Sequence, residues 1–116
     1  METGCEMSTN MYLDVKTKFF KGFGDKTRLA ILHSLKEGEM TVSEIVEKAQ
    51  MKQSNVSQHL ACLRGCGIIK SRQEGKFTYY SIRNDEILRF LDAADSILKG
   101  ISNEIYCCTH NDELIK

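Results

Sequence analysis

The segment from residue 51 to residue 83 constrains the fold more than any other part of the chain. It reads MKQSNVSQHLACLRGCGIIKSRQEGKFTYYSIR. Its second half contains two apolar runs, at residues 68–69 and 77–82, which are separated by polar residues that include Gly75. Runs rich in β-branched and aromatic side chains, joined by a turn that contains glycine, predict a β-hairpin. Its first half has helical periodicity.

Positive charge is concentrated in the same segment. Between residues 52 and 83 a single acidic residue, Glu74, stands against six basic ones: Lys52, Arg64, Lys70, Arg72, Lys76 and Arg83. This window therefore carries a net charge of +5, although the whole chain sums to zero. Local positive charge is what a polyanion-binding face needs, since contacts with phosphates are local. The alternative is a solvated hairpin with ordinary surface lysines.

The helical half of the segment divides into three faces. We predict a helix from Ser54 to about Cys66, with Ser54 as its N-cap and Gly67 in the left-handed position after its last turn. An advance of about 100° per residue separates an inward apolar face, a face of small or hydrogen-bonding side chains, and a third stripe. The faces are, in that order, Val56, Leu60 and Leu63; Ser54, Ser57, Gln58 and Ala61; and Asn55, His59, Cys62 and Cys66. The second face suits a major groove, where it can reach base edges.

The third stripe makes Cys62 and Cys66 neighbours, because residues one helical turn apart have Cβ atoms roughly 5–6 Å from each other. The chain contains five cysteines. In a reducing compartment, an odd number of cysteines indicates metal binding or reactive thiols rather than a disulfide framework. Sulfur donors select soft metal ions over magnesium, calcium or manganese. The alternative is that both thiols are small buried apolar groups, which is common for free cysteine.

Length and composition predict one globular domain over residues 1–116, with 41% hydrophobic and 28% charged residues. Residues 1–9 are expected to form a flexible tail. No apolar run approaches the length of a membrane span, and the polar start METGCEMSTN does not resemble a signal peptide, so we expect a cytoplasmic protein without membrane contact. An enzyme is not expected, because no Cys-His-Asn/Asp constellation can be identified.

Two further helices precede the thiol-bearing helix, after a first amphipathic helix that ends near residues 22–24. The second is expected from Asp25, its cap, to Lys36, and the third over residues 41–49, where Thr41 and Glu44 form a capping box. Two short helices followed by a basic hairpin predict a mainly α-helical, winged helix-turn-helix fold with about five helices. The apolar positions of the first two helices are Met11, Val15, Phe19 and Phe23, then Leu29, Ile31, Leu32 and Leu35.

A last helix is predicted over residues 84–106, with Asn84 as its cap and residues 107–116 as a tail. Its apolar residues are spaced 4-3-4-3-4, which is a heptad seam. A seam of this kind favours a homodimer, and a two-fold dimer also matches the half-site geometry of helix-turn-helix proteins. The alternative is a helix that lies on its own domain. The seam consists of Ile87, Leu91, Ala94, Leu98, Ile101 and Ile105.

From Phe19 to Ile82 the chain resembles the ArsR/SmtB family of winged-helix, metal-responsive repressors. The phrases that carry the resemblance are GDKTRLAILHSL, SNVSQHLACLRGCGIIK and EGKFTYYSI. The cysteines of SNVSQHLACLRGCG, together with Cys5-Glu6-Met7, are similar to the cadmium- and lead-sensing members. The resemblance implies a homodimer that binds double-stranded operator DNA when metal-free and releases it when metal binds.

The resemblance also implies a thiolate ligand set. Cys62 and Cys66 match paired ligands, and the third ligand would come from the C-terminal region of the other subunit, where Cys107 and Cys108 stand. Cys107 is favoured, and the doublet leaves the choice open. No cofactor is obligatory; the expected inducer is a soft ion, cadmium or lead, with zinc and arsenite as alternatives. The role of Cys5 stays open.

DNA contacts are expected from both halves of the 51–83 segment. We read His59 as a structural or DNA-adjacent residue rather than a fourth metal ligand. A second hypothesis is a thiol redox or persulfide switch on the same fold, in which Cys66 forms a disulfide with Cys107 or Cys108. The expected DNA-binding residues are Ser54, Asn55, Ser57 and Gln58 on the helix, with Arg72 and Lys76 on the wing.

Overall fold

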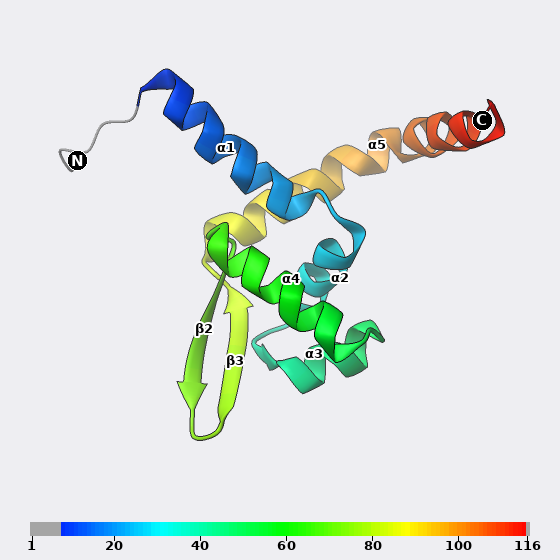
Figure 1. Ribbon diagram of the computed structural model, residues 1–116. Helices are drawn as coiled ribbons and strands as arrows, with labels where there is room; N and C mark the ends of the chain where they lie inside the picture. Colours follow the sequence, from blue (N-terminus) through cyan, green and yellow to red (C-terminus); the bar gives the residue numbers. More distant parts are fainter. Residues whose placement is uncertain (1–7, 116) are drawn as a thin grey trace. The chain divides into compact units, whose positions relative to one another are not determined.

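A computed structural model describes residues 8–115, and the side chains of residues 102–103 and 105–116 lie outside that description. The chain divides into two compact units at the bond between Arg83 and Asn84. The described residues form five helices and three strands (Figure 1), as a mainly α-helical chain with a hairpin predicts. The elements are α1 (Thr9–Phe23), α2 (Lys26–Leu35), β1 (Met40–Thr41), α3 (Val42–Ala49), α4 (Gln53–Gly65), β2 (Ile69–Glu74), β3 (Phe77–Ile82) and α5 (Asp85–Ile115).

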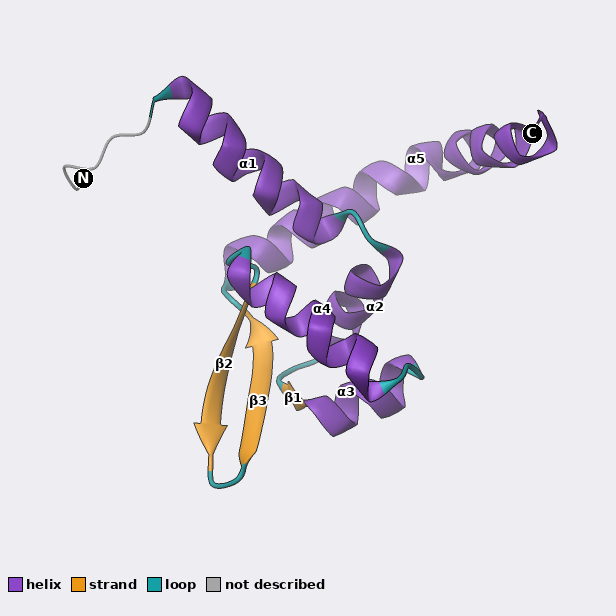
Figure 2. Cartoon of the chain, in the orientation of Figure 1, coloured by secondary structure: helices purple, strands orange, loops and turns teal. Residues whose placement is uncertain are grey.

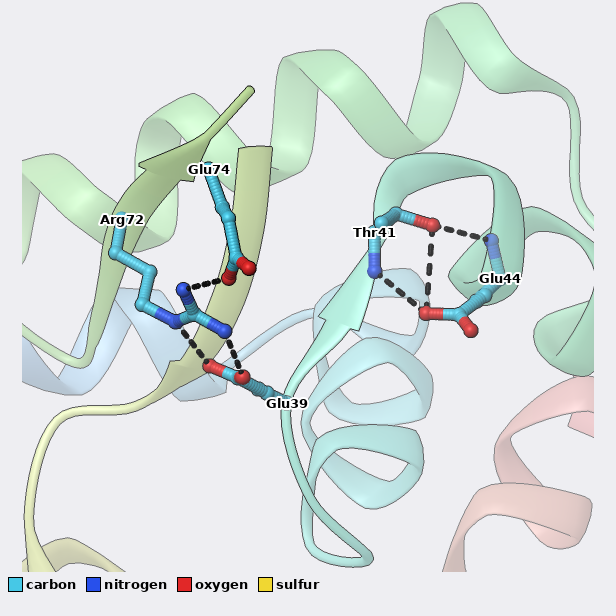
Figure 3. Close-up of polar contacts among 5 residues, drawn as sticks. All are labelled: Glu39, Thr41, Glu44, Arg72 and Glu74. Carbon is cyan, nitrogen blue, oxygen red and sulfur yellow. Dashed lines mark hydrogen bonds and ion pairs between the residues drawn. The ribbon is translucent and has the colours of Figure 1, made fainter. Parts of the chain in front are cut away.

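Local capping sets the starts of the first three helices. The Ser8 side chain accepts from the Met11 amide at the start of α1, within the segment expected to be a tail, and the Asp25 side chain accepts from the Arg28 amide at the start of α2. The Thr41–Glu44 capping box is present in both directions: the Thr41 amide donates to Glu44 Oε1 at 2.9 Å, and the Glu44 amide donates to Thr41 Oγ1 at 3.2 Å (Figure 3). The predicted caps of α2 and α3 are therefore confirmed.

The core of the first unit is aliphatic. It is formed by residues of α2, α3, α4 and the hairpin, each at most 8% exposed. Three of the predicted apolar positions in α1 and α2 are exposed: Leu29 of α2 is 44% exposed, and Met11 and Val15 of α1 are 54% and 53% exposed. Leu29 lies to the side of the stripe on which the buried residues of α2 fall when each residue advances by about 100°. The buried residues are Ile31, Leu32, Leu35, Ile45, Val56, Leu60, Leu63, Ile68, Ile69 and Ile82.

Helix α4 begins one residue earlier than predicted, and Ser54 is not its N-cap. Lys52 occupies that position with an extended backbone and no side-chain cap, so Ser54 is already helical and exposed. The reason lies in the preceding turn. Gln50 adopts a left-handed conformation (φ 55°) that ends α3 and reverses the chain quickly, so that the helical conformation resumes at Gln53.

The end of α4 follows the prediction. Gly67 is left-handed (φ 76°), the Ile68 amide donates to the Leu63 carbonyl at 3.1 Å, and the Gly67 amide donates to the Arg64 carbonyl at 3.0 Å. This pair of bonds is a Schellman motif, which satisfies the last carbonyls of a helix. Ile68 and Leu63 are both fully buried, which gives the apolar contact that accompanies the motif. The motif turns the chain from α4 directly into the hairpin.

The predicted hairpin is present, with Glu74 opposite Phe77 and Gly75 left-handed (φ 62°) in the turn. The sequence analysis missed β1, which pairs with β3 through Met40 opposite Tyr80 and gives the strand order β1-β3-β2 (Figure 2). A strand of two residues has no periodicity to detect, and its second residue is also the N-cap of α3. The wing is therefore joined to the start of α3 by backbone pairing.

Helix α5 forms the second unit, and the Asn84 side chain accepts from the Ile87 amide at 3.0 Å, as predicted. The helix continues to Ile115, so residues 107–115 are helical rather than a tail. No glycine or proline follows Gly100 to end it. Along the predicted seam Ile87 is buried, whereas Leu98 is 42% and Ile101 38% exposed; Ile105 falls among the side chains that are not described. None of the described helices is long and apolar enough to cross a membrane.

Helix α1 packs closely against the end of α4. Gly22 is buried, and a Cβ placed there would overlap Cδ1 of Ile68 and lie 3.5 Å from Sγ of Cys66. A Cβ at this position requires the Ile68 side chain to change its conformation. Such a change perturbs the packing around it, because interiors are packed to crystal-like density.

Replacing Gly22 with alanine tests this packing. We expect Gly22→Ala to lower the free energy of unfolding by about 1–3 kcal/mol, the usual cost of overpacking a core. The measurement is urea unfolding followed by circular dichroism. Gly65→Ala is the matched control, since nothing lies within 4 Å of a Cβ at that position; it should leave stability unchanged or raise it by up to about 1 kcal/mol. Equal stability of Gly22→Ala and the wild type would contradict the close approach of α1.

Candidate functional site

The second face of α4 is exposed, as predicted. Ser54, Ser57, Gln58 and Ala61 are all accessible, as is the neighbouring Asn55 of the third stripe, whereas Val56, Leu60 and Leu63 on the inner face are buried. Burial of the inner face determines which way the helix is turned about its axis. The outer face then presents short hydroxyl and amide side chains, which can enter a major groove and hydrogen-bond with base edges.

The wing places its two predicted phosphate-binding residues in different surroundings. Lys76 lies in the hairpin turn, with Nζ 5.8 Å from the centre of the Phe77 ring, and forms no ion pair with any residue that the structure describes. Arg72 donates from Nε and Nη2 to the two Glu39 carboxylate oxygens and from Nη1 to Glu74 (Figure 3). Lys76 is therefore available to a phosphate, and Arg72 is already engaged by two carboxylates.

The electrostatics of the wing follow from these ion pairs. Hydrogen bonds from Arg72 lower the pKa of the Glu39 carboxyl, and the two carboxylates raise the pKa of the Arg72 guanidinium. Both groups therefore stay charged at neutral pH. The sequence analysis did not single out Glu39, which lies 33 residues before Arg72. Nothing in the local pattern could have found it without the β1–β3 pairing.

Cys62 and Cys66 are free thiols on one side of α4, away from the Ser57–Gln58 face. Cys62 is exposed and Cys66 is partly buried beside Gly22. Burial raises the pKa of the Cys66 thiol, and the neighbouring Cys62 thiol raises it further, whereas Lys18 and Arg28 partly oppose the shift. Cys66 is therefore protonated at neutral pH. A cation that binds it must displace a proton.

Arg28 connects the thiol stripe to two other helices, and the sequence analysis did not single it out. Its Nε donates to the Gly22 carbonyl at 3.1 Å and its Nη2 to the Lys21 carbonyl at 2.7 Å, so one guanidinium caps the end of α1. Its Nη1 lies 3.3 Å from Nδ1 of His59 on α4. This partly buried contact supports a structural role for His59, since the ring nitrogen is in reach of a permanent cation.

Among the described residues, Cys62 and Cys66 are two neighbouring thiols that could serve as metal ligands. No group of three or more His, Cys, Asp or Glu side chains that could hold a metal occurs among them. Cys107 and Cys108 lie on α5, but their side chains belong to the part that is not described, and Cys5 lies outside the described residues altogether. A soft-metal site normally takes three or four donors, so two adjacent thiols would need one or two further donors to hold an ion.

An exposed helix that follows a short turn after α3, with a hairpin wing beyond it, defines a winged helix-turn-helix DNA-binding protein. The family described as "Bacterial regulatory protein, arsR family" matches residues 25–71. A probable mercury resistance operon repressor from Streptomyces lividans is 34% identical over 96 residues, which cover 83% of this chain and 77% of that protein. The chain therefore belongs to the arsR family of DNA-binding transcriptional regulators.

Other relatives and solved structures support the same family assignment. The regulator CmtR of Mycobacterium tuberculosis is 29% identical over 87 residues, which cover 75% of this chain and 74% of that protein. Among solved structures, the homodimeric winged helix-turn-helix DNA-binding domain of Mb0332 from Mycobacterium bovis superposes with a TM-score of 0.76 at 26% identity, over 84% of this chain and 91% of that one. The family resemblance and the winged-helix fold expected from the sequence are both confirmed.

The raised pKa of Cys66 predicts its alkylation behaviour. Only the thiolate reacts with iodoacetamide, so we expect the half-maximal rate at Cys66 at a pH above that of a free cysteine in solution. The measurement is rate against pH by mass spectrometry, in a variant whose other four cysteines are serine. Lys18→Gln removes an opposing charge and should move the midpoint higher still. A midpoint below that of free cysteine would contradict the assignment.

Proposed function

We propose that this chain is a metal-sensing transcriptional repressor: a homodimer that binds operator DNA when metal-free and is released by a soft, thiophilic ion held by cysteine thiolates. The observation that carries the proposal is the position of Cys62 and Cys66. Cys62 lies on the same helix as the exposed Ser57 and Gln58, on a different face, and Cys66 is the C-cap of that helix. The helix proposed to contact the bases then also carries part of the proposed metal site.

The printed names of several relatives support a soft metal as the inducer. Besides the probable mercury resistance repressor, a cadmium resistance regulatory protein CadC homologue from Staphylococcus aureus is 35% identical over 78 residues. The proposed donors of this chain are cysteine sulfurs, which bind soft metal ions in preference to hard ones. We propose cadmium or lead first, with zinc and arsenite as alternatives.

The proposed ligands are Cys62, Cys66 and a third thiolate from the C-terminal segment of the partner subunit, Cys107 or Cys108. When bound, the cation supplies the positive charge that stabilises these thiolates. Cys66 loses its proton on binding, so affinity for the ion falls as the pH falls. The nearby Lys18 and Arg28 favour the thiolate form of Cys66, whereas its partial burial beside Gly22 opposes that form until a cation binds.

On the DNA side, Ser57 and Gln58 are proposed to reach base edges, with Ser54 and Asn55 beside them at the start of the helix. Lys76 at the tip of the wing is proposed to contact a phosphate, because its ammonium carries no carboxylate partner among the described residues. Contacts with phosphates orient the protein, whereas contacts with bases select the sequence.

Metal and DNA compete through the arrangement of α4. Cys66 lies beneath α1 at Gly22, and Arg28 joins the end of α1 to His59 on α4. A restraint on the thiols therefore acts on the contacts that hold α4 in place. Coupling free energies of about 1–3 kcal/mol are typical of such linkage, which corresponds to a change in operator affinity of roughly 5- to 150-fold.

The dimer is proposed from apolar surface on α1 and α5. Along α1 a depression of about 610 Å³ is lined by Leu13 and Phe20 among other residues; Leu13 is 51% and Phe20 47% exposed. On α5, Ile97 is 64% and Leu98 42% exposed. A second copy is the proposed occupant, since the related Mb0332 domain is homodimeric and the α5 seam repeats at heptad spacing.

A charge placed on the α5 seam tests the dimer. We expect Leu98→Glu to sediment as a monomer in analytical ultracentrifugation, because the carboxylate would be buried without a partner. Ser96→Glu is the matched control: it adds the same charge at an exposed position of α5 off the seam and should remain a dimer. A dimeric Leu98→Glu variant would place the interface elsewhere.

Removal of one thiol tests the sensor. We expect Cys62→Ser to bind operator DNA as the wild type does and to lose release by cadmium, a change of at least about fivefold in the ratio of affinities with and without metal. Binding is measured by fluorescence anisotropy under reductant, with thiolate-to-cadmium absorption followed in parallel. Ser57→Ala is the control, since it should weaken DNA binding and leave metal absorption intact. Cadmium release that survives in Cys62→Ser shows the ligand assignment to be wrong.

The same DNA-binding assay distinguishes metal sensing from the alternative of a redox or persulfide switch. If an oxidant or polysulfide releases the wild-type protein from DNA without metal, while cadmium under reductant does not, the thiols act as a redox or persulfide switch. A disulfide of Cys66 with Cys107 or Cys108 would then appear in peptide mass spectra.

A further inference from the structure

The side chain of Arg72 crosses the three-stranded sheet. Arg72 lies on β2 directly opposite Tyr79 of β3, and Tyr79 lies opposite Thr41 of β1. The guanidinium passes over the Tyr79 ring, with Cζ 4.7 Å from the ring centre. It ends at Glu39, one residue before β1 (Figure 3). One side chain thus joins the outer strand of the wing to the segment that leads into α3.

The geometry at Glu39 is bidentate. Arg72 Nε donates to Oε2 at 3.0 Å and Nη2 donates to Oε1 at 2.5 Å, while Nη1 donates to Glu74 at 2.5 Å. Isolated exposed ion pairs contribute little to stability, but bidentate pairs within a network are the exception. The aromatic ring beneath adds a cation–π contact. The arrangement restrains the position of the wing relative to α3 more than a single exposed pair would.

The same geometry makes Arg72 a poor phosphate ligand. Its Nε, Nη1 and Nη2 all donate to carboxylates, and a phosphate would have to displace them. Glu39 and Glu74 also bring two negative charges to the place where the phosphate would bind, and like charges repel. Lys76, at the turn of the hairpin, has no such competitor among the residues that the structure describes.

We propose that Arg72 is a positioning residue for DNA binding: with Glu39 it forms a cross-sheet strut that holds the wing at a set angle to the α3–α4 unit, and it does not contact phosphate. The inference rests on the DNA-binding part of the proposed function and is independent of metal sensing. Backbone pairing joins β3 to β1, whereas the outer strand β2 pairs only with β3 and reaches the segment before β1 through the Arg72 side chain.

The test is a double-mutant cycle with Arg72→Gln, Glu39→Gln and the double variant. The probe is a fluorescent duplex selected by the wild-type protein from a randomised library, titrated at several salt concentrations. A strut predicts that each single variant binds about three- to fivefold more weakly, that the double variant binds no more weakly than either, and that the salt slope stays unchanged. Both side chains are exposed, so neither substitution leaves a buried charge.

Two control variants are measured beside the double-mutant cycle. Lys76→Gln should lower the slope of log affinity against log salt by about 0.9, the value for one phosphate contact. Glu47→Gln removes an exposed carboxylate of α3 without touching Arg72 and should bind DNA at least as tightly as the wild type. Weaker binding by Glu39→Gln, against this control, cannot then come from net charge.

The strut is overturned if Arg72→Gln lowers the salt slope by about 0.9 while Glu39→Gln binds as tightly as the wild type or more so, since Arg72 is then a phosphate ligand. Unchanged affinity in both single variants overturns it as well. Hydrogen exchange of the β2 amides in the DNA-free protein gives a separate reading: protection should fall in both variants and stay in Glu47→Gln. If the wild type selects no duplex, DNA binding fails as a function and the exchange data alone decide on the strut.

Discussion

The arrangement of this chain depends on the burial of one face of α4. Val56, Leu60 and Leu63 are at most 1% exposed, and a helix with its apolar stripe in the core cannot turn about its axis without exposing that stripe. Ser57 and Gln58 are therefore directed outward on one side, while Cys62 and Cys66 lie on another. The Schellman motif at Gly67 then leads the chain into the wing, so the position of the hairpin also follows from how α4 ends.

In the proposed function, the three faces of α4 allow DNA contact and metal binding to involve the same helix. The core face must stay fixed, the groove face must stay accessible, and the thiol face is the one on which a restraint can act. On that face Cys66 meets Gly22 of α1, and His59 meets Arg28 of α2. Linkage between two ligands requires that each prefers a different arrangement of a shared element, and α4 with its neighbours provides such an element.

On the wing, the net charge counted along the sequence differs from the positive charge that the folded surface offers to a ligand. The window from residue 52 to residue 83 carries a net charge of +5, but Arg72 is held by Glu39, which lies outside that window, and by Glu74. Lys70 also stands near enough to Glu39 to favour its ionised form. The positive charge that remains available is therefore nearer the tip of the hairpin and along α4 than the sequence alone suggests.

Local sequence patterns were enough to predict the winged helix-turn-helix fold, most helix boundaries to within about two residues, the capping box at Thr41, the hairpin turn at Gly75 and the three faces of α4. Each of these depends on periodicity or on hydrogen bonds between near neighbours. The sequence did not predict β1, the helical continuation past residue 106 or the exposure of Leu29. Three contacts became evident from the folded structure alone: Glu39 with Arg72, Arg28 with His59 across 31 residues, and Gly22 beside Cys66. These contacts depend on how separate elements pack in space, for which no local pattern carries a signal.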